Sequence, residues 1–324
     1  SKNLTDVIRL MSLNSNTMDN LERSYRLLLQ PLFKFIHFLN KNTVTGSKKN
    51  IVRHYDLSNE FFALFLDQRM MYSAAIYPNT KSTLEQAATH KIKVICEKLR
   101  LKPSDRLIEI GSGWGGFAIY AAQNYGCHVT TTTISEQQYV YVKNKIKQLG
   151  LIKKIKLLKK DYRQLSGKYN KLVSIEMIEA VGHQFYDTYF GKISNLLTED
   201  GDAVIQAITI RDQRYQEALK SVDFIQKYIF PGSTIPSLNS IQNSLIRSTN
   251  MTIFNIQDIG DDYAKTLNDW KKRFTSQKKE IAKLGFDEHF MRMWFFYFCY
   301  CEGGFKEKVI SDIHLHITKP LYRN

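Results

Sequence analysis

A glycine-rich segment, EIGSGWGG (109–116), is the strongest chemical signal in this chain of 324 residues. It follows a short apolar run, 106–110, so the glycines lie at a strand-to-helix turn where the backbone can approach a ligand closely. Its glycines also fit the dinucleotide fingerprint, but that fingerprint expects an acid at the end of the second strand. Here that strand ends in three threonines, 131–133.

Two acidic residues favour a methyltransferase site over a dinucleotide site. Glu109 stands two residues before the first glycine, which is the common form of the loop that binds S-adenosylmethionine. Asp161 ends the third predicted strand, where such folds commonly hold the amino group of adenine. The sequence therefore predicts an S-adenosylmethionine site at this edge of a sheet.

The elements that position this site alternate regularly after Leu101. Helical stretches separate the apolar runs, and such βα units predict a parallel, doubly wound α/β sheet with ligands at the carboxyl ends of its strands. The predicted strands are 106–110, 128–135, 154–161, 171–178 and 203–210. After Arg211 the pattern becomes irregular and aromatic, which suggests a substrate-side insertion at about 211–250.

Residues 1–50 form a separate helical segment in this interpretation, and residues 51–324 form the main domain. Apolar side chains recur at helical spacing through 21–40, with basic residues between them. That pattern fits a helix lying on a membrane surface, and it also fits a helix packed on its own domain. The first residue is Ser, which indicates processing or a native N-terminus further upstream.

The net charge of +15 favours an anionic partner, either nucleic acid or a membrane surface. No RNA-binding motif appears, and the fourth strand ends in IEMIEA rather than in the turn of base-amino methylases, so nucleic acid is disfavoured. No apolar run reaches the roughly 18 residues of a membrane span, and no signal peptide is apparent. The cysteines show no metal spacing, so we expect no metal and a cytoplasmic protein.

Over nearly its whole length the sequence resembles the cyclopropane-fatty-acid synthase family, which includes the mycolic acid cyclopropane synthases. The resemblance implies a class I methyltransferase fold of the Rossmann-like type and a reaction at the double bond of a phospholipid acyl chain. It also implies a dry apolar pocket, because water would quench the carbocation formed there. The matching blocks, in order, are 54–73, 107–116, 133–138, 161–165, 179–190, 227–237 and 259–270.

The resemblance also implies which residues contact S-adenosylmethionine, and the glycine loop adds further candidates. The implied contacts are Tyr72, Ser73, Gly111, Gly113, Thr133, Gln138, Asp161 and Tyr162, and the loop adds Glu109, Ser112 and Trp114.

Family members usually hold bicarbonate as the base, and three of its ligands carry over by resemblance. They are Glu179, the hydroxyl of Tyr263 and the backbone amide of Ile208. The two others are absent, because Ala74 replaces a cysteine and Gln206 replaces a histidine. Charge-assisted hydrogen bonds are the strong ones, so this departure puts bicarbonate in doubt.

Glu176, three positions before Glu179, is a replacement for the missing anion. Burial would raise the pKa of a carboxyl group there and let it act as a base. The hypothesis is that Glu176 or Glu179 is the base and that the product carries a methylene or methyl branch. An ordinary cyclopropane product stays open, as does a role of Glu176 in binding the cofactor or in pairing with a lysine.

The expected partner is an unsaturated phospholipid in an anionic membrane, reached from its inner face by a peripheral protein, and a homodimer is left open. The alternative is methylation of a small-molecule amine, because plant alkaloid N-methyltransferases resemble this family too. Their sites accept polar substrates.

Overall fold

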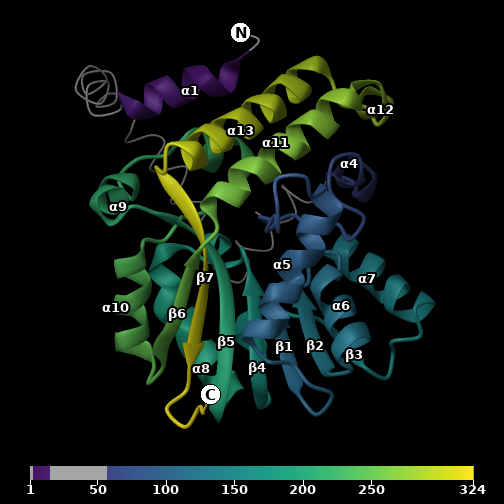
Figure 1. Ribbon diagram of the computed structural model, residues 1–324, viewed down its shortest axis with the longest axis vertical. Helices are drawn as coiled ribbons and strands as arrows, with labels where there is room; N and C mark the ends of the chain where they lie inside the picture. Colours follow the sequence, from purple (N-terminus) through teal and green to yellow (C-terminus); the bar gives the residue numbers. More distant parts are fainter. Residues whose placement is uncertain (1–2, 15–56, 324) are drawn as a thin grey trace.

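The computed structural model describes residues 3–14 and 57–323. Its centre is a seven-stranded sheet in the order β3-β2-β1-β4-β5-β7-β6 (Figure 1). Strands β1 to β5 are parallel, and β7 runs antiparallel to both β5 and β6. The strands are β1 Arg106–Ile110, β2 His128–Thr133, β3 Ile155–Lys159, β4 Tyr169–Ile175, β5 Leu197–Ile210, β6 Thr252–Asp258 and β7 Ile310–Thr318. The doubly wound α/β prediction is confirmed.

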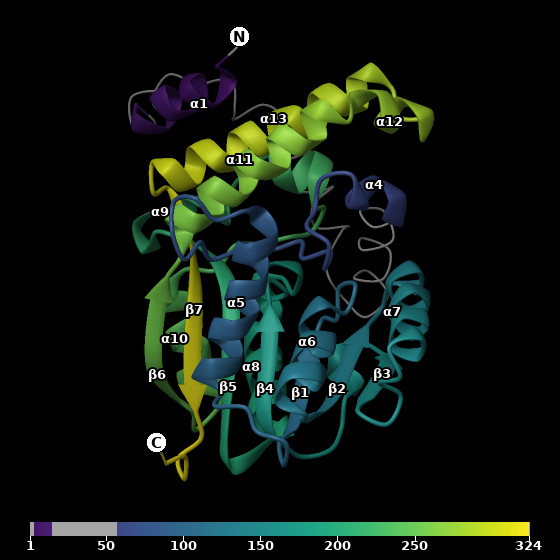
Figure 2. The same cartoon turned by 45° about the vertical axis from the view of Figure 1, so that its right-hand side comes forward.

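Helices cover both faces of the sheet, with α5, α6 and α7 on one face and α8 and α10 on the other (Figures 1 and 2). Successive strand residues point to opposite faces, so Leu107 packs under α5 and α6 while Ile108 packs under α8. The α-helices are α1 Leu4–Leu13, α4 Asn59–Ala63, α5 Leu84–Lys98, α6 Gly116–Tyr125, α7 Glu136–Gln148, α8 Tyr186–Leu196, α9 Asp212–Ala218, α10 Leu238–Ser248, α11 Gly260–Ser276, α12 Lys278–Lys283 and α13 Glu288–Lys306.

The predicted strand ends differ by one to six residues from those of β2, β3 and β5, and two differences matter more. The fourth strand ends at Ile175, not at residue 178, because Glu176 has a φ of +47° and turns the backbone out of the strand. The region after Arg211 is not irregular, since it contains β6 and β7. The signal for β7 is in the sequence ISDIHLHIT (310–318), where polar and apolar residues alternate.

Above the carboxyl ends of the parallel strands, α11 and α13 lie side by side (Figure 2). They pack with α4 around an aromatic cluster that includes Phe61, Trp270 and Trp294. The apolar stretch 291–305 lies in α13 and contributes both to the core and to a cavity. Trp294 belongs to the core, whereas Tyr300 lines the cavity described below.

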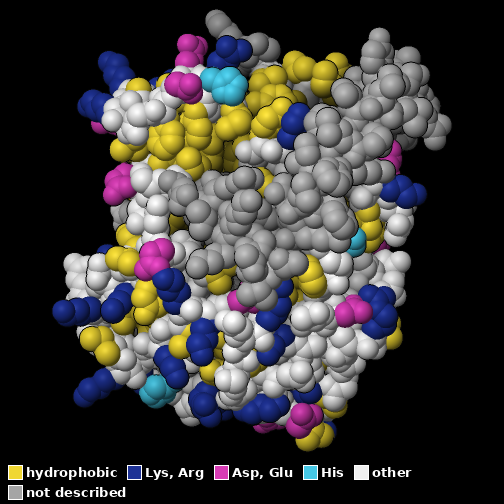
Figure 3. Space-filling view, turned by 180° about the vertical axis from the view of Figure 1, so that it is seen from behind, with side chains coloured by type: hydrophobic (Ala, Val, Ile, Leu, Met, Phe, Trp, Pro, Cys, Tyr) yellow, Lys and Arg dark blue, Asp and Glu magenta, His cyan; other side chains and the backbone are white. Residues whose placement is uncertain are grey.

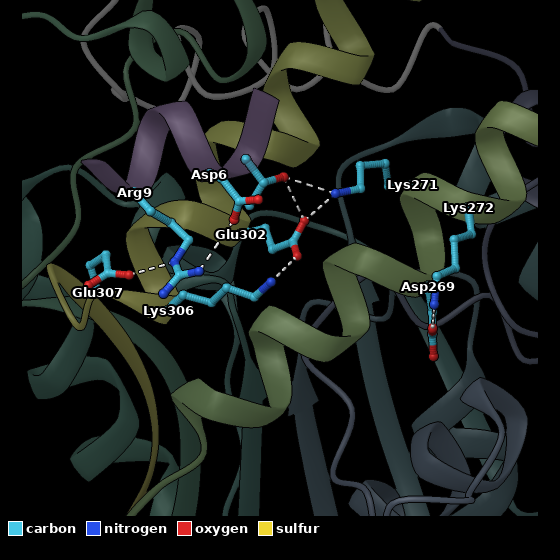
Figure 4. Close-up of polar contacts among 9 residues, drawn as sticks. Asp6, Arg9, Asp269, Lys271, Lys272, Glu302, Lys306 and Glu307 are labelled. Atoms are coloured by element: carbon cyan, nitrogen blue, oxygen red, sulfur yellow. Dashed lines mark hydrogen bonds and ion pairs between the residues drawn. The ribbon is translucent and has the colours of Figure 1, made fainter. Parts of the chain in front are cut away.

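The first described helix, α1, packs across α13 (Figure 4). Glu302 of α13 is 2% exposed and accepts a hydrogen bond from Thr5 of α1 at 3.0 Å. The same carboxylate contacts Lys271 of α11, and it pairs with Lys306 at 2.6 Å. Arg9 adds an ion pair to Glu307 at 2.6 Å.

The predicted amphipathic helix at 21–40 and the boundary at residue 50 lie outside the described residues. On the face seen in Figure 3, hydrophobic side chains gather in the upper part and basic side chains spread over the lower half. None of the helices in 3–14 and 57–323 is both long and apolar enough to cross a membrane.

Candidate active site

A cavity of about 760 Å³ lies at the carboxyl ends of β1, β2, β4 and β5. Helices α11 and α13 contribute Tyr263 and Tyr297 to its wall, and α1 contributes Ile8 and Met11. Within the predicted insertion 211–250, Phe230 also lines it, whereas α10 packs against α8 on the sheet. The cavity therefore joins the sheet edge predicted to hold the cofactor with an apolar space beneath the helices.

The glycine loop after β1 has the backbone that the motif predicts. Gly111 and Gly113 have φ angles of +95° and +48°, which side-chain-bearing residues rarely adopt. A Cβ atom added at Gly113 would meet nothing within 4 Å, so open space lies beside the loop. The amide of Ser112 donates to the carbonyl of Thr132 at 2.8 Å, which fixes the loop against β2. This shape fits a ligand that approaches the backbone.

Glu109, at the end of β1, is buried at the floor of the cavity. Its carboxylate accepts a hydrogen bond from the hydroxyl of Thr131 on the neighbouring strand. Burial raises the pKa of Glu109 to about 8, against the opposing effects of Thr131 and Lys91.

The other predicted cofactor residues all line the same cavity, and several are held in place by hydrogen bonds. The Thr133 hydroxyl donates to Oε1 of Gln138 at 2.8 Å, and Asp161 forms a two-point ion pair with Arg163. The hydroxyl of Tyr162 has no hydrogen-bond partner within the described chain. Tyr72, Ser73, Ser112 and Trp114 complete the set on the cavity wall.

Glu176 lies directly after β4, and its carboxylate collects three donors from three distant segments. The amide of Ala74 donates to Oε1 at 2.6 Å, and the side-chain amide of Gln206 donates to the same oxygen at 2.7 Å. The hydroxyl of Tyr263 donates to Oε2 at 2.8 Å. Two positions of the expected anion site, 206 and 263, and the backbone at Ala74 thus direct their hydrogens to a protein carboxylate.

Glu179 lies beside Glu176 in the same cavity but has a poorer set of partners. The backbone amide of Ile208 donates to its Oε1 at 2.6 Å. Its Oε2 is buried and has no partner among the described residues. Burial raises the pKa of Glu179 to about 8, and the charge of Glu176 adds to this shift.

Burial also raises the pKa of Glu176, but the hydrogen bond from Ala74, the charge of Lys91 and further hydrogen bonds oppose the shift. Tyr263 has a pKa well above its ordinary value, because of burial and of the negative charge of Glu176. It therefore stays protonated and remains a donor to Glu176.

Sequence reasoning missed three buried residues next to this cluster: Lys91, Asp312 and His314. The Lys91 ammonium group donates to the hydroxyl of Ser73 at 2.7 Å, and burial lowers its pKa to about 8. Asp312 accepts from Gln206 at 2.8 Å, and burial followed by the charge of Glu176 raises its pKa well above the ordinary value. The alternation in β7 was the available signal for Asp312 and His314, whereas nothing in the sequence marks Lys91 as buried.

No group of three or more His, Cys, Asp or Glu side chains within 3–14 and 57–323 has the geometry of a metal site.

Comparison with known proteins decides the family. The family model for mycolic acid cyclopropane synthetase matches residues 42–315. The chain belongs to this family. It is 36% identical over 267 residues to a tuberculostearic acid methyltransferase of Mycobacterium tuberculosis, covering 80% of this chain and 62% of that protein. It is also 36% identical over 258 residues to the cyclopropane-fatty-acyl-phospholipid synthase of Escherichia coli, covering 80% and 64%. The chain thus spans less than two thirds of the length of these relatives.

Among solved structures, a mycolic acid cyclopropane synthase in complex with SAH and CTAB superposes with a TM-score of 0.79 at 28% identity. The match covers 84% of this chain and 98% of that one. The present chain thus has the class I, Rossmann-like methyltransferase fold that its sequence predicted.

Proposed function

We propose that this protein is an S-adenosylmethionine-dependent C-methyltransferase that adds a one-carbon unit to the double bond of an unsaturated phospholipid acyl chain. The observation that carries the proposal is the joint cavity. Its sheet end has the glycine loop of a nucleoside site, and its other end is walled by apolar side chains of α1, α11 and α13. The names of the relatives, a fatty acid methyltransferase among them, support a lipid substrate.

S-adenosylmethionine supplies an electrophilic methyl group at this site. The glycine loop 111–113 offers close backbone approach to its amino-acid and ribose parts. Asp161, two residues after the end of β3, offers a carboxylate to the adenine amino group, and Arg163 holds that carboxylate in place. Thr133 and Gln138 close the same side of the cavity. The apolar wall excludes water from the methylated chain, whose positive charge would otherwise be quenched.

Glu176 is the base in this proposal. Once a methyl group has been added to one alkene carbon, the positive charge lies on the other, and a hydride shift from the methylated carbon moves the charge to that carbon. Glu176 then takes a proton from the methyl group, and its C–H electron pair forms the C=CH2 bond; without the shift, loss of the same proton would close the ring. Three donors hold the Glu176 carboxylate in one orientation at the cavity wall, so it takes the place of an external anion. Glu179, whose pKa is about 8, stays largely protonated at neutral pH and does not compete for the proton.

The product we propose is a methylene-branched chain. In the family pattern, the bicarbonate ligands at positions 74 and 206 accompany ring closure, and this chain has Ala74 and Gln206 there. Both products add one CH2 to the substrate, so mass alone does not separate them. The difference is the double bond, which survives in a branched methylene product and is lost on ring closure.

Access to the acyl chain is proposed to come from an anionic membrane, with the protein bound peripherally at its inner face. On α1, Leu10 and Leu13 are 64% and 67% exposed, while Ile8 and Met11 of the same helix line the cavity. The chain also carries a net charge of +15. Apolar side chains beside the cavity and excess basic charge suit a surface that meets anionic lipids. Vesicle binding that ignores both lipid charge and salt would contradict this.

The test is incubation of the full chain with S-adenosylmethionine and monounsaturated phospholipid vesicles, followed by gas chromatography and mass spectrometry of the fatty acids. We expect a product one CH2 heavier that retains one double bond and takes up hydrogen on catalytic reduction. A product of the same mass that resists hydrogenation as a ring would contradict the branched product but support the methyltransferase. No modified lipid would overturn the lipid substrate, and the amines would be tested next.

A further inference from the structure

Strand β7 places polar side chains in register with Gln206 of β5. The antiparallel pairing sets His314 opposite Gln206 and Asp312 opposite Ile208. Because alternate residues of a strand point to the same face, Asp312 and His314 both face α5. Gln206, Asp312 and His314 have no exposed surface. Their polar atoms therefore depend on one another, and an error in one orientation cannot be corrected by solvent.

A continuous line of contacts leads from α5 through these residues to Glu176. Nζ of Lys98, at the end of α5, lies 3.2 Å from Nδ1 of His314. Nε2 of His314 lies 3.3 Å from Oε1 of Gln206. The other end of the Gln206 amide, Nε2, donates to Oε1 of Glu176 at 2.7 Å.

The side chain of Lys98, at one end of this line, fixes which atom of each contact donates and which accepts. Burial lowers the pKa of Lys98 to about 8, so at neutral pH its side chain is mostly an ammonium group. An ammonium group donates and cannot accept, so Nδ1 of His314 accepts from Lys98 and Nε2 carries the ring hydrogen. That hydrogen then points to Oε1 of Gln206, which leaves the NH2 group of Gln206 facing Glu176.

The reverse orientation of Gln206 is disfavoured at both ends. It would set an amide oxygen against Oε1 of Glu176 and against the carbonyl oxygen of Ala74, which now lie 2.7 and 3.3 Å from the nitrogen and can only accept. It would also set an NH2 group against the N–H of His314. The orientation of one amide therefore decides whether Glu176 receives a hydrogen or meets a lone pair.

We propose that Lys98 and His314 are positioning residues for the reaction, which hold the Gln206 amide so that its hydrogens face Glu176 and keep this carboxylate ionised as the base. The inference rests on the proposed role of Glu176. His314 acts while neutral throughout, because burial, followed by the charges of Lys98 and Lys91, holds its pKa well below the ordinary value.

The pH dependence of turnover reports the orientation of Gln206, provided that the other groups that influence the pKa of Glu176 stay unchanged. The charged or titratable groups that face Glu176 are Lys91 from α5, Tyr263 from α11, Asp312 from β7 and Glu179 from its own loop, and those that face His314 are Lys98 and Lys91 from α5. None of them is altered by substitutions at His314. A hydrogen bond to a charged group contributes enough to move a pKa by about one unit.

The first experiment compares His314→Leu, His314→Gln and the wild type in the full chain, with S-adenosylmethionine and monounsaturated phospholipid vesicles. For His314→Leu we expect the acid limb of the kcat profile to move up by about one pH unit, with a roughly tenfold loss of kcat below it. We expect no change in the KM for S-adenosylmethionine. His314→Gln keeps a donor near Nε2, so it should restore the profile.

His316→Gln is the matched control, because His316 lies on the same face two residues further along and pairs with Asp202 at 2.8 Å, away from Glu176. It should lower stability without moving the profile. If His314→Leu does not fold, Lys98→Met takes its place, with a smaller shift in the same direction. An unmoved acid limb in the folded variant, with Glu176→Gln inactive, would overturn the inference and leave the proposed function standing.

Nitrogen NMR of the histidines gives a readout that does not depend on activity. We expect His314 to carry its hydrogen on Nε2 from about pH 6 to 7, below the pKa of about 8 to which burial lowers Lys98, and Lys98→Met to increase the other tautomer. A hydrogen on Nδ1 in the wild type would overturn the inference. A Glu176→Gln protein with full turnover would instead remove the proposed base, and the inference with it.

Discussion

Two glutamates in this molecule, Glu302 and Glu176, hold their carboxylates in opposite surroundings. Glu302, at the packing of α1 on α13, is contacted by two ammonium groups, those of Lys271 and Lys306 (Figure 4). Glu176, at the cavity, is held by uncharged donors from Ala74, Gln206 and Tyr263. Glu302 is buried and Glu176 is partly buried, and the two carboxylates also differ in what compensates their charge.

The pKa values follow that difference. Burial alone would raise the pKa of Glu302, but the hydrogen bonds from Lys271 and Lys306 outweigh it, and the pKa lies below the ordinary value. For Glu176, burial prevails and the pKa lies above it. A carboxylate paired with ammonium groups fixes a helix, whereas one held by neutral donors keeps its affinity for a proton. The comparison teaches that the balance between burial and the charge of the partners separates a stabilising acid from a reactive one.

Replacing Glu176 by Gln should give the largest effect. The amide keeps the shape but cannot accept a proton, so we expect turnover to fall by about 1,000-fold, within the range for loss of a general base. Thermal unfolding and S-adenosylmethionine binding should change little. Turnover within threefold of the wild type would contradict the role of Glu176 as the base.

Replacing Glu302 by Gln should act on stability instead. The loss of charge-assisted hydrogen bonds to Lys271 and Lys306 should lower the free energy of unfolding by about 2 kcal/mol. Denaturant unfolding measures this, with Glu280→Gln as the control, because the Glu280–Lys283 pair on α12 is exposed and should contribute under about 0.5 kcal/mol. Equal effects from the two substitutions would mean that the buried cluster does not hold α1.

Replacing Glu179 by Gln tests whether this carboxyl group, which has fewer hydrogen-bond donors than Glu176, matters less for turnover. Because Glu179 is largely protonated at neutral pH, an amide resembles it, and we expect a loss of turnover of only about tenfold. Steady-state kinetics beside Glu176→Gln measures the contrast. A greater loss at Glu179 than at Glu176 would transfer the role of base to Glu179.

Acidification should separate the two glutamates by pH. The folded pKa of Glu302 is depressed, so its contribution to stability is present above its ordinary value of 4.5 and is lost as pH falls through the lower folded value. The pKa of Glu176 is raised, so turnover should decline while pH is still above 4.5. Parallel measurements of kcat and Tm on acidification should therefore show activity falling at a higher pH than stability. Coincident losses would contradict the contrast.

Much of the fold and one half of the site could be predicted because their signals are local. Glycines at a strand-to-helix turn and the acids Glu109 and Asp161 lie within single βα units, so their spacing alone predicts a sheet edge that binds a nucleoside. The same logic did not reach β7, because its alternating residues indicate a strand but not its pairing with β5 and β6.

The sequence by itself thus determined the family, the βα alternation and the unusual residues Ala74, Glu176 and Gln206. Only the tertiary structure decided what these residues do together. Ala74, Glu176, Gln206 and Tyr263 come from four segments, and their contacts span up to 132 residues. The buried charge of Lys91 is likewise invisible in a local pattern, and the alternation around Asp312 does not show which residues its carboxyl meets. A pKa depends on every charge and donor within a few ångströms, and that neighbourhood exists only once the chain has folded.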